Sequence, residues 1–158
     1  FLALGILLPW GFHQFGIAGR IFLPMHIPVL LCGFMMGAIP ALIVGIGAPV
    51  LSHLLTGMPP AYAVPLMALE LPLYGLSAAL FYRKWRWNIY LALVVSMIAG
   101  RLGFALGLFL LGLFIQMPYG PAQLFATGGA FVSGLPGTLL QIFIIPPLVA
   151  AANRRKFR

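Results

Sequence analysis

The sequence predicts an all-α integral membrane protein: a bundle of six transmembrane helices with both termini in the cytoplasm. Of the 158 residues, 63% are hydrophobic and only 6% are charged, whereas a soluble globular chain carries about 25% charged residues. The apolar residues form long runs and do not alternate with polar ones, which excludes a transmembrane β-barrel. We therefore expect one transmembrane domain over residues 1–158, located in the cell membrane as a multi-pass protein.

The basic residues indicate how the chain lies in the membrane. The net charge is +8, but most of the basic residues lie in one short turn and in the C-terminal tail: Arg83, Lys84, Arg86, Arg154, Arg155, Lys156 and Arg158. Short loops that carry an excess of Lys and Arg face the cytoplasm. This distribution argues against nucleic-acid binding and fits a surface that faces anionic lipid.

The first three predicted helices are short or closely spaced. The first covers about residues 1–16 and the second about 26–37, and both are short for a bilayer, which takes about 20 residues. The first spans if the true N-terminus extends further, and the second spans if residues 21–25 extend it. The third, about 39–56, follows an uncharged turn. Small residues at Gly33, Gly37, Ala41 and Gly45 are typical of closely approaching helices.

The fourth predicted helix, about 61–82, follows a Gly/Pro loop at 57–60 and contains Pro65 and Pro72. Each proline removes a backbone donor and tends to kink a helix. In a membrane, neighbouring helices or a bound ligand can meet the carbonyls that are freed.

The fifth predicted helix, about 88–115, is the longest. Its small residues Ala99, Gly103 and Gly107 lie roughly 160° around the helix from Arg101, at about 100° per residue. We expect one face to make a close helix contact and the other to carry the charge. A long Gly/Pro-rich connection, 116–136, precedes the sixth helix, about 137–153. Loops of this length are usually functional or mobile.

An even number of helices places both termini on one side, and the basic tail makes that side cytoplasmic. The basic turn 82–87 then also faces the cytoplasm, whereas the loops 17–25, 57–60 and 116–136 face outward. Polar side chains concentrate toward the outward ends. This pattern predicts an outward-facing pocket, although hydrated outer loops alone would give a similar pattern.

Glu70 and Arg101 are the charges that the apolar runs contain near their centres. Glu70 is the only acidic residue of the chain. A charge at mid-membrane costs about 2.5–3.5 kcal/mol on insertion scales, so such residues usually pair or mark a substrate path. Two interpretations remain open: an ion pair that holds the fourth helix to the fifth, and direct contact of one or both residues with a ligand.

The residues that enzymes use are not arranged for catalysis. No Ser/His/Asp set, phosphate-binding loop or pair of carboxylates is present, and the three histidines match no local metal motif. We therefore expect no enzymatic activity, no cofactor and no metal. His26 precedes Ile-Pro and is expected to form a hydrogen bond near the second helix.

Four motifs resemble one known family. They are His-Ile-Pro-Val-Leu-Leu-Cys-Gly-Phe-Met-Met-Gly from residue 26, Gly-Ile-Gly-Ala-Pro-Val-Leu-Ser-His-Leu-Leu-Thr-Gly-Met-Pro-Pro from residue 45, Met-Ala-Leu-Glu-Leu-Pro-Leu-Tyr-Gly-Leu from residue 67, and Ala-Gly-Arg-Leu from residue 99. The run from about 20 to 112 is similar to the substrate-binding S components of energy-coupling factor (ECF) vitamin transporters. The family's Ala-x-x-x-Ala pattern in helix one is not visible, since Leu7 follows Ala3 at the fourth position.

The resemblance implies a six-helix domain that binds a vitamin near the outer face and associates with a transmembrane coupling subunit and two cytoplasmic ATPases. The family's pocket positions imply these substrate-binding residues here: Arg20, His26, Thr56, Met58, Tyr62, Glu70, Tyr74, Arg101 and Gln141. The motifs look most like the pantothenate branch. Pantothenate carries a carboxylate, two hydroxyls and an amide, which one arginine and several neutral donors would suit.

Several alternatives remain open. The S component would bind another vitamin, such as cobalamin, hydroxymethylpyrimidine or folate, if its pocket differs from the pantothenate type. A non-transporting membrane scaffold would use the Glu70–Arg101 pair only for structure. A solitary proton-coupled carrier would transport without ATPase partners.

Overall fold

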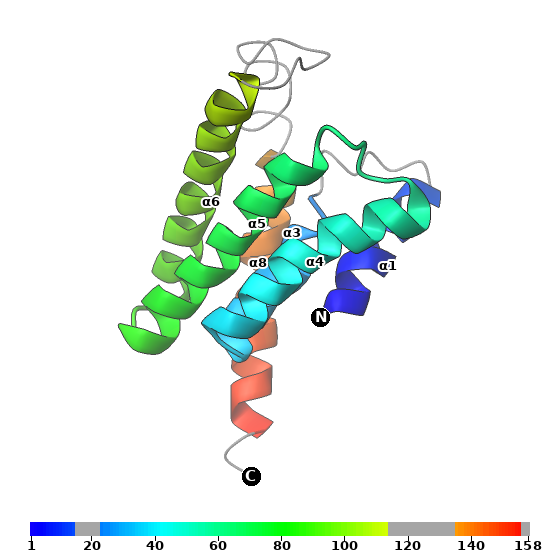
Figure 1. Ribbon diagram of the computed structural model, residues 1–158. Coiled ribbons are helices and arrows are strands. Elements are labelled where there is room, and N and C mark those ends of the chain that lie inside the picture. Colours follow the sequence, from blue (N-terminus) through cyan, green and yellow to red (C-terminus); the bar gives the residue numbers. More distant parts are fainter. Residues whose placement is uncertain (15–22, 114–134, 156–158) are drawn as a thin grey trace.

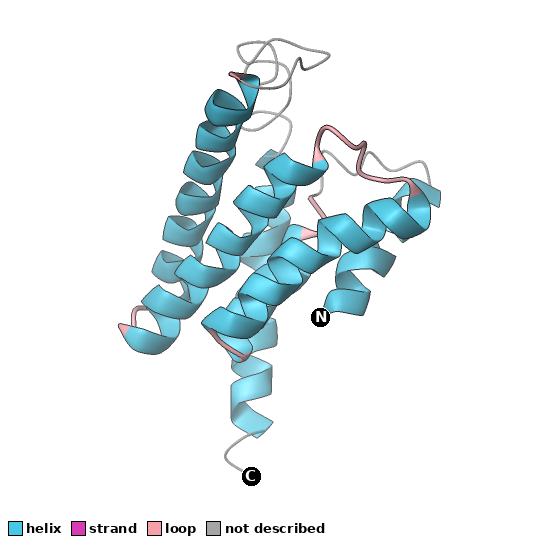
Figure 2. Cartoon of the chain, viewed as in Figure 1, coloured by secondary structure: helices cyan, strands magenta, loops and turns pink. Residues whose placement is uncertain are grey.

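The computed structural model describes residues 1–14, 23–113 and 135–155. Within these ranges all of the regular secondary structure is helical, and short loops and turns join the helices (Figures 1 and 2). The helices are α1 (Leu2–Gln14), α3 (His26–Met35), α4 (Ala38–Thr56), α5 (Val64–Ala78), α6 (Ile89–Gly112) and α8 (Leu135–Arg155). A π-helical segment, η1 (Ala79–Lys84), continues α5 without a break.

Four of these helices are long and apolar enough to cross a membrane: Ala38–Thr56, Val64–Lys84, Ile89–Gly112 and Leu135–Asn153. The helices α1 and α3, with 13 and 10 residues, are shorter than the roughly 20 residues that a span requires. Six spans therefore stay a prediction. Residues 24 and 25 form a turn before α3 and do not extend it, and residues 21 and 22 lie outside the described ranges.

The helix α5 lies at the centre of the bundle. It packs against α4 on one side and α6 on the other, while α3 lies behind α4 and α5, and α8 packs against α3 and α6 (Figure 1). The helix α1 lies beside α4. Successive helices run in alternating directions, so the start of α3, the start of α5 and the start of α8 lie toward one end of the bundle (Figure 1).

Small residues permit close contact between α5 and the helices α3 and α4. A Cβ atom added at Gly33 would lie 2.3 Å from the carbonyl oxygen of Gly75, and one added at Gly45 would lie 2.7 Å from the backbone nitrogen of Pro72. Both distances are shorter than any side chain tolerates. Of the predicted small-residue positions, Gly33, Ala41 and Gly45 therefore function as contact points with α5.

On the other side of α5, glycines of α6 make the contact. A Cβ atom at Gly100 would lie 2.1 Å from the Tyr74 ring, and one at Gly103 would lie 2.1 Å from Leu73. Gly103 and Gly107 are buried, but Ala99 is only half buried, and Gly100 takes its place in the contact.

The expected separation of the two faces of α6 is wrong. The Arg101 side chain also approaches α5, where it meets Glu70. Its long, flexible chain carries the guanidinium around the helix toward the same neighbour that the glycine face contacts.

A hydrophobic cluster joins α3, α5, α6 and α8, and we call it the four-helix cluster. It contains Leu30, Leu31, Phe34, Tyr74, Ala78, Ala92, Leu93, Met97, Ile145 and Val149. A second cluster joins α3, α4 and α5 around Val29, Cys32, Ala41 and Leu71. The two clusters meet at α3 and α5, so these helices form the core on which the site is built.

Candidate functional site

The single acidic residue is buried where three helices meet. Glu70 is 3% exposed, and its Oε1 atom lies 3.4 Å from Nε2 of His26 and 3.4 Å from a terminal guanidinium nitrogen of Arg101. Glu70 comes from α5, His26 from the first residue of α3, and Arg101 from the middle of α6. The carboxylate thus connects α5 to two of the helices that pack on it.

The electrostatics explain why these residues gather. An isolated carboxylate in an apolar interior loses its hydration and becomes neutral, whereas a nearby cation favours the charged form. Both contacts with Glu70 are longer than the 2.7–2.9 Å that is typical of charge-assisted hydrogen bonds. A carboxylate accepts about four hydrogen bonds, so the Glu70 carboxylate can accept a hydrogen bond from a further donor.

His26 has one ring nitrogen that faces no partner. The side chain is buried, and its Nε2 atom lies toward Glu70, whereas Nδ1 has no hydrogen-bond partner among the described residues. When Nε2 carries the ring proton and donates a hydrogen bond to Glu70, Nδ1 is a hydrogen-bond acceptor. Tyr74, one turn after Glu70 on α5, packs edge-on against the imidazole, with 4.8 Å between the ring centroids.

Gln141 presents a second unpartnered polar group. It lies on α8 with 1% exposure, and its Nε2 atom has no hydrogen-bond partner in the described part of the chain. Gln141 precedes Ile145 by one turn and His26 precedes Leu30 by one turn, and both Ile145 and Leu30 belong to the four-helix cluster. The two polar residues thus border the same cluster, on the side toward the start of α3 and α8.

An unsatisfied buried polar group is costly, typically by about 1–3 kcal/mol. His26 Nδ1 and Gln141 Nε2 therefore mark positions where a bound polar molecule would recover free energy. The group formed by His26, Glu70, Tyr74, Arg101 and Gln141 contains five of the nine predicted site residues. Contacts connect the first four, whereas Gln141 is linked to them only through Ile145, one turn later on α8, which belongs to the same hydrophobic cluster as Tyr74.

Three other predicted residues lie on or next to the loop between α4 and α5. Thr56 donates to the carbonyl of Ser52 at 2.7 Å and accepts from the backbone N–H of Met58 at 3.3 Å. Met58 is exposed and Tyr62 is half buried. Their described contacts stay within the loop and do not reach Glu70. Arg20 lies outside the described residues.

Two contributions were not foreseen from the sequence. His26 was expected to bond near its own helix, but it reaches Glu70 on α5. His53 was not among the predicted site residues. Its Nδ1 lies 2.7 Å from the carbonyl oxygen of Pro59, and this contact holds the loop to α4. A signal for His26 existed: a chain with one acid offers few partners for a buried imidazole.

Within residues 1–14, 23–113 and 135–155, no group of three or more His, Cys, Asp or Glu side chains is placed to hold a metal ion. The polar cluster is suited to binding a neutral or anionic organic molecule, since it offers a guanidinium, an amide and an imidazole.

Comparison with known proteins identifies the family. The family described as "ECF transporter, substrate-specific component" matches residues 1–149. No curated protein and no solved structure gives a match to this chain. Substrate-specific components are the substrate-binding subunits of membrane transporters and are not enzymes. The match covers nearly the whole chain, and the long apolar helices agree with it: the chain belongs to the family of substrate-specific components of ECF transporters.

Proposed function

We propose that this S component captures a small water-soluble vitamin, with pantothenate as the first candidate, at the cluster formed by His26, Glu70, Tyr74, Arg101 and Gln141. The observation that carries the proposal is the pair of buried atoms that lack a hydrogen-bond partner among the described residues, His26 Nδ1 and Gln141 Nε2, together with the Glu70 carboxylate that His26 and Arg101 share.

The donors and acceptors of the cluster define the ligand. With the ring proton on Nε2, His26 accepts a hydrogen bond at Nδ1, so the ligand supplies a hydroxyl or amide N–H there. The amide nitrogen of Gln141 donates, so the ligand supplies a carbonyl or hydroxyl oxygen. The contact with Glu70 uses one terminal nitrogen of Arg101, and a guanidinium has five donors in total. A ligand carboxylate would find a partner in Arg101.

Pantothenate offers all of these groups in one small molecule: hydroxyls for His26, an amide for Gln141 and a carboxylate for Arg101. Tyr74 and the adjacent apolar residues of the four-helix cluster would cover its aliphatic part. Cobalamin, hydroxymethylpyrimidine and folate offer different combinations of these groups, and a binding panel separates them.

The loop residues Thr56, Met58 and Tyr62, together with Arg20, would contact the ligand at the outer entrance. In this proposal the protein lies in the cell membrane with six spans and cytoplasmic termini. The chain has one acid and no nucleotide-binding motif, so the energy for release comes from two ATPases through a transmembrane coupling subunit.

The first test is mass spectrometry of small molecules that are released when the purified protein is denatured. We expect a stoichiometric vitamin, and we expect isothermal titration of the emptied protein to give the highest affinity for the same compound. A protein that is repeatedly empty and binds nothing in the panel would favour the scaffold alternative.

A variant pair tests the site itself. Arg101→Ala should abolish vitamin binding, because a carboxylate would lose its cationic partner, whereas Lys84→Ala removes an exposed cation at the far end of α5 and should bind like the wild type. Unfolding midpoints are measured alongside. If Arg101→Ala lowers only the midpoint and keeps the affinity, Arg101 is structural and the proposed site is wrong.

A further inference from the structure

The basic turn 82–87, which covers the end of η1 and residues before α6, carries positive charge that no nearby acidic side chain compensates. Arg83, Lys84 and Arg86 are exposed, and the only acidic side chain of the protein, Glu70, is buried on α5. Arg83 donates to the carbonyl of Met35, at the end of α3. Because the chain has no second acidic side chain, Lys84 and Arg86 are available to an anionic partner outside the chain.

The turn lies at a membrane surface because it connects two long apolar helices. Val64–Lys84 has 21 residues and Ile89–Gly112 has 24, and each is long enough to cross the roughly 30 Å hydrocarbon core. The turn between them then lies at the level of the lipid headgroups. The N-terminal end of α6, which begins here, adds the positive end of a helix dipole.

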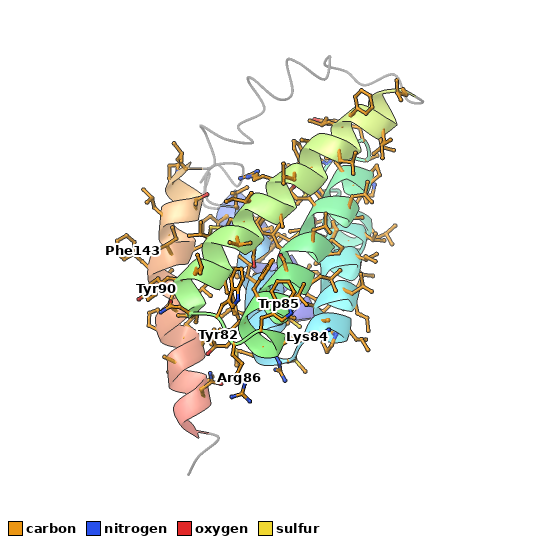
Figure 3. All side chains as sticks on the ribbon, turned by 90° about the vertical axis from the view of Figure 1, so that its left-hand side faces the viewer. Tyr82, Lys84, Trp85, Arg86, Tyr90 and Phe143 are labelled. Atoms are coloured by element: carbon orange, nitrogen blue, oxygen red, sulfur yellow. The ribbon has the colours of Figure 1, made fainter. Side chains whose placement is uncertain are left out.

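Aromatic residues lie close in sequence to the two cations. Trp85 packs against Phe81 and Trp87, with 5.1 Å and 5.7 Å between the ring centroids. Trp85 and Tyr90 are nevertheless 51% and 55% exposed. Figure 3 shows Lys84, Trp85 and Arg86 at one end of the bundle, with Tyr90 at the start of α6. Exposed Trp and Tyr side chains are typical of the membrane–water interface.

Tyr90 begins an exposed apolar row on α6 that runs away from the turn. The row continues with Leu91, Val94, Ile98 and Leu102. A phosphate near Lys84 and Arg86 would thus have, directly beside it, an apolar surface that suits acyl chains. A soluble anion would use only the cations, and an acidic protein would have to cover the exposed tryptophan and tyrosine as well.

From these observations we propose that Lys84 and Arg86, bordered by Trp85 and Tyr90, form a binding site for the headgroup of an anionic membrane lipid. The acyl chains lie along the exposed face of α6. This site is independent of the vitamin site, which lies deeper in the bundle around Glu70.

The experiment compares phosphatidylglycerol with phosphatidylcholine as ligands of the detergent-purified protein, by native mass spectrometry. Wild type should retain phosphatidylglycerol preferentially. Each cation near a charged surface contributes roughly five-fold to binding, so Lys84→Gln/Arg86→Gln should lower the preference by about 25-fold. In phosphatidylcholine, the unfolding midpoint of this double variant should match that of the wild type.

A charge-matched control is Arg154→Gln/Arg155→Gln, which removes two cations from the C-terminal end of α8. This control should keep most of the preference. An equal loss in both double variants would show that net charge, and not the turn, holds the lipid, and the proposal would be wrong. A turn variant that keeps its lipid but no longer assembles with the coupling subunit would also overturn it, in favour of a protein-docking surface.

The wild-type protein provides a measurement that needs no variant. Phosphatidylglycerol should raise the unfolding midpoint more than phosphatidylcholine does, and 1 M salt, with a Debye length of about 3 Å, should remove the difference. Equal midpoints in the two lipids at low salt would contradict a specific headgroup site.

Discussion

At the scale of residues, the protein concentrates its intramembrane polarity on one carboxylate. Glu70 contacts both His26 and Arg101 through a single oxygen atom. Removal of one member of a buried charge pair leaves the other uncompensated, which costs more than the pair contributes. The arrangement therefore connects three helices, and in the proposed function it also presents polar groups to a ligand.

A double-variant cycle tests this pairing. Glu70→Gln keeps the shape of the side chain but leaves Arg101 without an anion, and we expect a loss of about 3–5 kcal/mol in the free energy of unfolding. Glu70→Gln/Arg101→Met removes both charges and should recover most of that loss. Unfolding in detergent, followed by intrinsic fluorescence, measures both. Equal losses in the single and the double variant would mean that the two charges do not interact.

At the scale of elements, α5 determines the packing of its neighbours. The helices α3 and α4 approach its backbone through Gly33 and Gly45, and α6 approaches its side chains through Gly100 and Gly103. In lipid, helices associate through close van der Waals contact, because the surrounding acyl chains are as apolar as the helix surfaces. The positions of these glycines therefore set how near His26 and Arg101 come to Glu70.

Gly33→Ala should destabilise the bundle, because the new methyl group would meet a backbone oxygen that cannot move aside. Overpacking of this kind typically costs about 1–3 kcal/mol. The matched control is Gly11→Ala on α1, where nothing lies within 4 Å of the added Cβ. Thermal unfolding should show a lower midpoint for the first variant only. Similar midpoints would mean that α3 and α5 are not in close contact.

At the scale of the whole molecule, the two ends of the bundle differ in chemistry. The end with the α4–α5 loop carries hydroxyl and imidazole groups, whereas the other end carries the basic turn. There, Asn153 of α8 donates to the Tyr82 hydroxyl at 3.1 Å, which joins the end of α8 to η1. The orientation predicted from the basic residues, in which this end faces the cytoplasm, stays a prediction.

Cysteine labelling tests that orientation. The native Cys32 is fully buried, so the wild-type protein should stay unlabelled by a membrane-impermeant maleimide. Met58→Cys should react in intact cells, and Lys84→Cys should react only after the membrane is opened. Labelling of Lys84→Cys in intact cells, with Met58→Cys protected, would reverse the orientation. Reaction of both from one side would mean that α5 does not span the membrane.

The sequence by itself determined the membrane class, the positions of the helices and the identity of the charged pair. Apolar run length and Gly/Pro breaks predicted, for example, 39–56 and 88–115, where the structure has Ala38–Thr56 and Ile89–Gly112. These features are local, because in an apolar environment the backbone has to satisfy its own hydrogen bonds within each segment.

Only the tertiary structure decided which helices meet and which polar atoms lack partners. The contact between His26 and Glu70 spans 44 residues, and no periodicity encodes it. The unpartnered atoms of His26 and Gln141 depend on how α3 and α8 pack around the four-helix cluster. Helix packing follows the shapes of surfaces that come from distant segments, and for that reason the sequence located the helices and named candidate residues but not the contacts between them.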